Sequence, residues 1–71
     1  MRDINRLDDF YNTIKDIHKK YVPDWRFGQL ICNFAGWLYN KYKRDWFFIE
    51  EEDTLKYFKE YLKDEFGIKE V

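Results

Sequence analysis

The stretch Phe27-Gly-Gln-Leu-Ile-Cys-Asn-Phe-Ala-Gly-Trp-Leu-Tyr-Asn40 contains no charged residue, although 38% of the 71-residue chain is charged. A charge is costly to bury without a partner, so a charge-free run in such a chain marks the segment around which the protein folds. The large apolar side chains of this run fall on one helical face, which is formed by Phe27, Leu30, Ile31, Phe34 and Leu38. A helix that lacks charge on nearly all sides is predicted to be buried.

The segments on either side of this run each carry one apolar stripe with steps of three and four residues. The first stripe consists of Leu7, Phe10, Ile14, Ile17 and Tyr21, and the second of Leu55, Phe58, Leu62 and Phe66. This spacing predicts amphipathic helices over about 5–20 and 51–66. Asn5 and Asp24 are the expected N-caps of the first and second helices, and Gly67 is the expected stop of the third.

The segment Asp45-Trp-Phe-Phe-Ile49 joins the second and third helices and is too aromatic for a free loop. We interpret it as an extended lid whose rings seal one end of the core. The expected fold class is all-α. Residues 1–71 form one compact three-helix domain, in which a buried central helix at about 25–42 lies between its neighbours and an aromatic connecting segment precedes the third helix.

Composition argues against several classes of function. A net charge of −1 is not the basic balance of a nucleic-acid-binding domain. One cysteine and one histidine cannot complete a zinc site, so we expect no metal and no cofactor. The charge-free run is shorter than the ~20 apolar residues of a membrane span, and no secretory signal pattern begins the chain. We therefore expect a cytoplasmic protein without a membrane segment.

No group of residues points to catalysis. The run Glu50–Asp53 suits the positive start of a helix better than a metal site, because consecutive carboxylates on a helix point in different directions. His18 stands at a helix end, and the chain contains no serine that it could activate. Cys32 lies in mid-helix without basic neighbours and is interpreted as a packing residue. We expect a protein that is not an enzyme.

Arg26 stands immediately before the charge-free run and is expected to need a carboxylate partner if it is even half-buried. Asp24, Asp45 and the acidic run beginning at Glu50 could supply one. The sequence therefore predicts a structural ion pair between Arg26 and one of these residues.

Small residues recur on the flat side of the central helix at Gly28, Cys32 and Gly36, with Gln29 and Tyr39 beside them. Two interpretations stay open at this point. The small residues allow close contact with another helix of the same chain, or they form a flat surface for a partner protein or a second copy. Each glycine costs about 1 kcal/mol relative to alanine in a helix interior, so one of these contacts should offset that cost.

Two basic clusters support an alternative interpretation. They consist of Lys15, Lys19 and Lys20, and of Lys41, Lys43 and Arg44. Each ends a predicted helix, where cations interact favourably with the helix dipole. If the two helix ends met, with Tyr39, Tyr42 and Trp46 nearby, they would form a phosphate-binding and base-stacking surface.

The chain resembles a family of short bacterial and prophage proteins of unknown function. The pattern begins with Met1, Arg2, Asp3 and Arg6, continues as Pro-Asp-x-Arg-x-Gly-Gln-Leu from Pro23 to Leu30 and then Asn33, and ends near Asp45, Phe47, Glu50 and Glu51. It covers about residues 1–62. Trp46 departs from it, because the family commonly has proline there. The resemblance implies a small helical protein that is often carried on mobile elements, and it assigns no catalytic residues.

Two functions follow as expectations. The first is a small non-enzymatic protein-protein interaction module whose candidate partner-binding residues are Gly28, Gln29, Cys32, Gly36 and Tyr39. The resemblance and the small size add that it could be phage-encoded and inhibit a host or bacterial-defence protein. A homodimer is a further option. The alternative function is an accessory nucleic-acid-binding protein that uses the basic helix ends.

Overall fold

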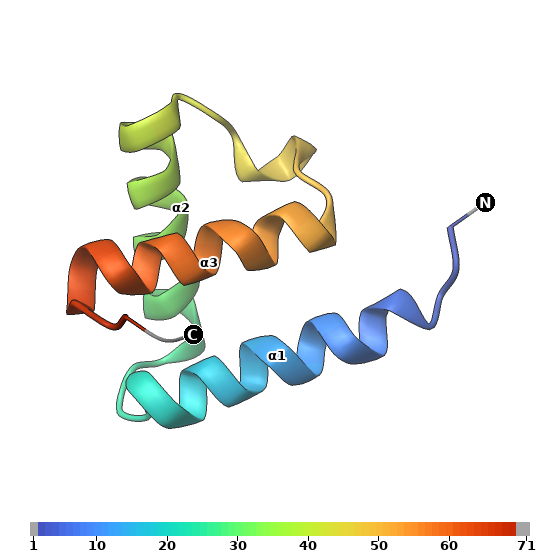
Figure 1. Cartoon of the computed structure of the whole chain (residues 1–71), viewed down its shortest axis with the longest axis horizontal. Coiled ribbons are helices and arrows are strands. Elements are labelled where there is room, and N and C mark those ends of the chain that lie inside the picture. Colours follow the sequence, from blue (N-terminus) through green and yellow to red (C-terminus); the bar gives the residue numbers. More distant parts are fainter. Residues whose placement is uncertain (1, 70–71) are drawn as a thin grey trace.

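The computed structural model describes residues 2–69 and contains three long helices and one short turn of 3-10 helix. The elements in chain order are α1 (Arg6–Tyr21), α2 (Phe27–Tyr42), η1 (Trp46–Phe48) and α3 (Glu51–Phe66). Helices α1 and α3 pack against each other and run in the same general direction, and α2 crosses them near one end (Figure 1). The all-α, three-helix fold class is confirmed.

The helix ends show which of the caps and stops predicted from the sequence are present in the structure. Gly67 adopts a left-handed conformation, with φ 68°, and its N–H donates to the Lys63 carbonyl, so the predicted stop of α3 is confirmed. Asn5 is the N-cap residue of α1, as predicted, although its side chain makes no capping hydrogen bond. The predicted N-cap of α2 is wrong, because that position belongs to Arg26 and not to Asp24. There the Arg26 backbone N–H donates to Gln29 Oε1 at 2.8 Å, so glutamine satisfies the helix start.

The core is built around a stack of aromatic rings. Phe34 of α2 and Phe58 of α3 are fully buried, with ring centroids 3.7 Å apart and planes 9° from parallel. The edges of Trp46 and Tyr61 meet both rings. Aliphatic side chains from all three helices surround the stack, and the buried ones are Ile14, Ile17, Leu30, Leu38 and Leu62, with Val22 and Ile49 from the connections. Large rings therefore give this short chain much buried area per residue.

The central helix of the fold is α3, and the prediction that α2 is enclosed is wrong. Helix α3 packs against both α1 and α2, whereas α2 buries only the face that carries Leu30, Phe34 and Leu38. Its opposite face is exposed from Gly28 to Asn40. The reason is that an uncharged face can be buried without penalty but is not forced to be. Asparagine and glutamine are mostly exposed in folded proteins, tyrosine carries a polar hydroxyl, and glycine has no side chain that gains by burial.

The connection between α2 and α3 is a 3-10 turn and not an extended lid. Asp45 Oδ1 accepts a hydrogen bond from the Phe47 N–H at 2.9 Å and so caps η1. Trp46 packs inward, where its Nε1–H donates to Thr54 Oγ1 at 2.9 Å. Phe47 and Phe48 point outward and are 83% and 76% exposed. One ring of the three therefore covers the core.

Candidate functional site

The five residues that the sequence suggested for partner binding lie together on the exposed side of α2, which we call the flat face. They are Gly28, Gln29, Cys32, Gly36 and Tyr39, and each is exposed. A Cβ atom added at Gly28 or Gly36 would meet nothing within 4 Å. No other helix in the described part of the chain approaches these glycines. The interpretation of the small residues as an internal close contact is therefore wrong.

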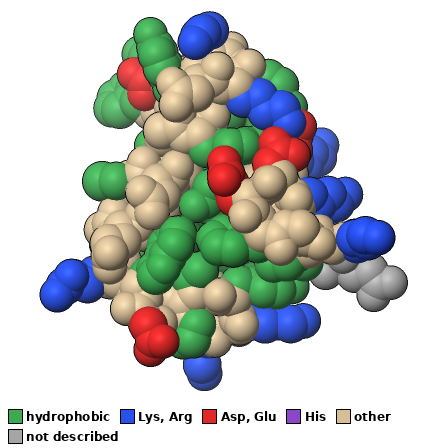
Figure 2. Space-filling model, turned by 90° about the vertical axis from the view of Figure 1, so that its left-hand side faces the viewer, with side chains coloured by type: hydrophobic (Ala, Val, Ile, Leu, Met, Phe, Trp, Pro, Cys, Tyr) green, Lys and Arg blue, Asp and Glu red, His purple; other side chains and the backbone are tan. Residues whose placement is uncertain are grey.

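A groove borders the flat face on the side toward α3. It has a volume of about 500 Å³, and Cys32 and Gly36 belong to both the groove and the flat face. Four aromatic side chains line it, namely Trp25, Trp37, Tyr61 and Phe66. Figure 2 shows this side of the molecule, with hydrophobic side chains gathered centrally and lysine and arginine side chains around the edge. Asn33, Asn40 and Glu65 also line it, so a partner side chain that entered the groove would meet both aromatic and polar surface.

A polar network holds α2 and α3 together at one end of the groove. Lys41 Nζ donates to Glu60 Oε1 at 2.9 Å and to Asp64 Oδ2 at 2.6 Å. Trp37 Nε1–H donates to the same Asp64 oxygen at 3.2 Å, and the Tyr42 hydroxyl donates to Glu60. This network positions the Trp37 ring that lines the groove.

The same hydrogen bonds shift the acidity of the groups in the network. Those from Lys41 and Trp37 lower the pKa of Asp64, and those from Tyr42 and Lys41 lower the pKa of Glu60. Both carboxylates in turn raise the pKa of Lys41. Because each of the three side chains keeps about a third of its surface in contact with solvent, the network contributes modestly to stability and mainly fixes geometry.

The predicted ion pair of Arg26 is not formed. Its side chain is exposed and has no carboxylate within 4 Å among residues 2–69. Asp24 is exposed, Asp45 caps η1, and Glu50 forms an ion pair with Arg2. A half-buried position would have required a partner for Arg26, but the start of α2 lies at the surface.

Two arginines that the sequence reasoning did not place in ion pairs join the N-terminal segment to α3. Arg2 pairs with Glu50, and Arg6 Nε donates to Glu51 Oε1 at 2.7 Å, which lowers the pKa of that carboxyl group. The partners are more than forty residues apart in the chain. No local pattern could have indicated them. The acidic run therefore lies at the start of α3, and two of its carboxylates also form ion pairs with these arginines.

His18 and Cys32 are the two remaining residues that the sequence analysis considered. His18 Nε2–H donates to the Trp25 carbonyl at 2.8 Å and so joins the end of α1 to the connection that follows it. Cys32 is exposed rather than packed, which corrects its interpretation as a packing residue.

Within residues 2–69, no three His, Cys, Asp or Glu side chains are grouped closely enough to hold a metal ion. No helix in that part of the chain combines the length and apolar character that crossing a bilayer requires.

The two basic clusters do not meet. One lies at the C-terminal end of α1 and the other at that of α2, and these ends are on opposite sides of the molecule (Figure 1). Lys41, in the second cluster, is also neutralised by Glu60 and Asp64. The combined phosphate-binding and stacking surface that the nucleic-acid alternative requires is therefore not assembled.

Comparisons with known proteins return no match among family models, curated proteins or solved structures. The resemblance to short bacterial and prophage proteins therefore depends on the sequence pattern alone. Any function assigned to the flat face and its groove has to rest on their geometry and chemistry.

Proposed function

We propose that this protein is a small non-enzymatic module that binds one partner protein through the flat face of α2 and the groove beside it. The observation that carries the proposal is the open space at Gly28 and Gly36. Glycine in a helix interior costs about 1 kcal/mol relative to alanine, and no contact within the described chain requires it at Gly36. A partner that packs closely against the α2 backbone would explain why glycine is needed at this position.

The side chains around the two glycines suit such an interface. Tyr39 is 57% exposed at one edge, and tyrosine is among the residues that most often dominate binding energy. Gln29 accepts the Arg26 backbone N–H with its side-chain oxygen, which leaves its amide N–H₂ free to donate. The face between them has no charge, so docking here requires no ion to lose its hydration.

The resemblance supports a narrower version of the proposal. In this version the protein is encoded by a phage or prophage, acts in the cytoplasm, and inhibits a host or bacterial-defence protein by covering part of its surface. A small helical domain without catalytic groups is suited to this kind of action, because inhibition by binding needs only a complementary surface.

Capture of binding proteins from a bacterial lysate with matched bait variants tests the proposal. Gly36→Leu places a branched side chain on the flat face, where the open space lets the protein stay folded. Asn12→Leu makes a similar addition at an exposed position of α1 and serves as the control. We expect one saturable partner that the original chain and the Asn12→Leu variant retain and the Gly36→Leu variant loses.

Two results would contradict the proposal. One is equal capture of the same partner by the Gly36→Leu and Asn12→Leu variants, which would place the interface elsewhere. The other is recovery of nucleic acid alone, with binding that weakens steeply as salt rises, which would favour the alternative function.

A further inference from the structure

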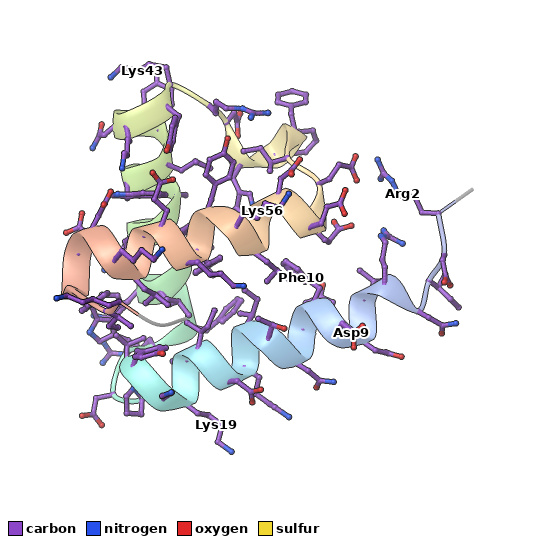
Figure 3. The ribbon with its side chains drawn as sticks, viewed as in Figure 1. Arg2, Asp9, Phe10, Lys19, Lys43 and Lys56 are labelled. Atoms are coloured by element: carbon purple, nitrogen blue, oxygen red, sulfur yellow. The ribbon has the colours of Figure 1, made fainter. Side chains whose placement is uncertain are left out.

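A second surface depression, which we call the furrow, runs between α1 and α3. Two adjoining hollows of about 570 and 240 Å³ form it, and Leu55 of α3 lines both. Phe10, which is labelled in Figure 3, extends from α1 toward α3 in the first hollow. Ile17 and Tyr21 line the second. The furrow therefore has an apolar floor along its whole length.

The end of the furrow near the helix N-termini carries net negative charge. Arg2 and Arg6 line it, but both are already paired with carboxylates of α3. Five carboxylates share this end with the two arginines: Asp3, Asp9, Glu50, Glu51 and Glu52. The excess negative charge therefore resides on Asp3, Asp9 and Glu52.

The end near the C-termini carries net positive charge. Lys20 of α1 and Lys59 of α3 line it, with Asp16 as the one carboxylate among the lining residues. Lys56 and Lys63 lie one turn on either side of Lys59 and are exposed. None of these four lysines forms an ion pair among residues 2–69.

We infer that the furrow binds one amphipathic helix of a partner protein, which runs antiparallel to α1 and α3. Its acidic first turn lies beside Lys20 and Lys59, and its basic last turn lies beside Asp9 and Glu52. Its apolar side chains cover the floor at Phe10, Ile17 and Leu55. Amphipathic helices are recognised in this way, by complementary charge along an apolar groove.

The direction of the bound helix follows from the dipoles as well as the side chains. Parallel helices α1 and α3 present their positive ends at one end of the furrow and their negative ends at the other. A third helix aligned antiparallel to both places its own dipole favourably. From Asp9 to Lys20 the furrow accompanies α1 for about 17 Å, or roughly three helical turns.

A nucleic acid fits this furrow less well than a helix. Phosphates would be attracted by Lys20 and Lys59 but repelled by the carboxylates at the other end. The floor offers one partly buried aromatic ring at each end, Phe10 and Tyr21, and no row of exposed rings on which bases could stack.

The inference goes beyond the proposed function, because the furrow lies between α1 and α3 whereas the flat face belongs to α2. Either surface could fail its test while the other passed. The probe here is a synthetic helical peptide with leucines along one side, glutamates in its first turn, lysines in its last turn and a nitroxide at its N-terminus. A second peptide has the same composition, with glutamate and lysine mixed in both halves.

NMR titration of the labelled protein with each peptide tests the inference. We expect saturable shifts for the first peptide at the floor residues, nitroxide broadening near Lys20 and Lys59, and weaker binding of the mixed peptide. Reversal of charge in Lys20→Glu with Lys59→Glu should weaken binding about tenfold. The control Lys15→Glu with Lys19→Glu makes the same charge change on exposed lysines outside the furrow and should alter binding little.

Four results would overturn the inference. These are no shift with either peptide at millimolar concentration, shifts confined to the flat face, broadening near Asp9 and Glu52 instead of the lysine end, and equal weakening by the control pair. Salt-sensitive binding of a single-stranded oligonucleotide at Lys20 and Lys59 would also overturn it, because the furrow would then recognise phosphates.

Discussion

Both sides of α2 are uncharged, but one side is buried and the other is exposed. Leu30, Phe34 and Leu38 are fully buried on one side, whereas Gly28 and Gly36 face open space on the other. Neither side carries an ionic group between Phe27 and Asn40. Most of the large apolar side chains lie on the buried side and gain by leaving water, although Phe27 at the start of that face is 61% exposed. The other side carries small and polar residues together with Tyr39. The uncharged exposed side is consequently free for contact with another molecule.

Truncation of the buried side should have the largest effect. Phe34→Ala removes a ring that stacks on Phe58 at 3.7 Å and is fully buried. We expect a loss of about 3–5 kcal/mol, which approaches the whole stability of a domain this small. Urea denaturation followed by circular dichroism measures it. Cys32→Ala, two residues away on the exposed side, should change stability by less than about 0.5 kcal/mol, and equal losses would contradict the assignment of the two sides.

The same contrast exists within the connection η1. Trp46→Ala removes a ring that meets Phe34 and Phe58 and donates to Thr54, so we expect a loss of about 2–3 kcal/mol. Phe47→Ala should lie within about 0.5 kcal/mol of the original chain, because that ring is 83% exposed. Thermal melting of both variants is the measurement. A larger loss for Phe47→Ala would show that its ring, and not that of Trp46, covers the core.

Gly36→Ala should make the isolated protein more stable. The added Cβ meets nothing within 4 Å, and alanine is favoured over glycine in a helix interior by about 1 kcal/mol. The midpoint of urea denaturation should rise with an unchanged slope. A lower midpoint would mean that another part of the folded chain contacts Gly36, and the flat face would then not be open.

The smallest effect concerns pH. Hydrogen bonds lower the pKa of Glu60 and Asp64 below the ordinary values of 4.5 and 3.8. Such carboxyl groups stabilise the folded state fully when the pH is above their ordinary pKa values. As the pH falls through the lowered pKa values of the folded state, the carboxylates become protonated and this stabilisation is lost. Stability should therefore decline below about pH 4.5, and less steeply in Lys41→Met. Melting temperatures between pH 7 and pH 2 at low and high salt measure the difference, and identical profiles for both proteins would contradict it.

Helical periodicity predicted most of the fold. The stripes that include Ile14, Ile17, Phe58 and Leu62 do face the core, and Gly67 does end α3. These features depend on residues within a few turns of one another, which a single sequence displays directly. The five flat-face residues were also predicted as a group, because spacing along one helix determines which side chains share a face.

Features that depend on contacts between distant segments could not be predicted. The pairing of Arg6 with Glu51 requires knowledge of how α1 lies on α3. The absence of charge in α2 left both burial and exposure open, since it removes a penalty for burial without adding a reason for it. Trp46, Phe47 and Phe48 have similar character, and only the turn geometry of η1 determines which ring points inward.

The reactivity of Cys32 in the native protein tests the openness of the flat face most directly. Cys32 is exposed and lies on the same face as Gly28 and Gly36, so a thiol reagent reports whether that side of α2 meets solvent. We predict labelling at a rate within about tenfold of that in the unfolded chain, at protein concentrations low enough to exclude self-association. Labelling that is slowed more than about a hundredfold and accelerates only with global unfolding would show a covered face and contradict an open α2.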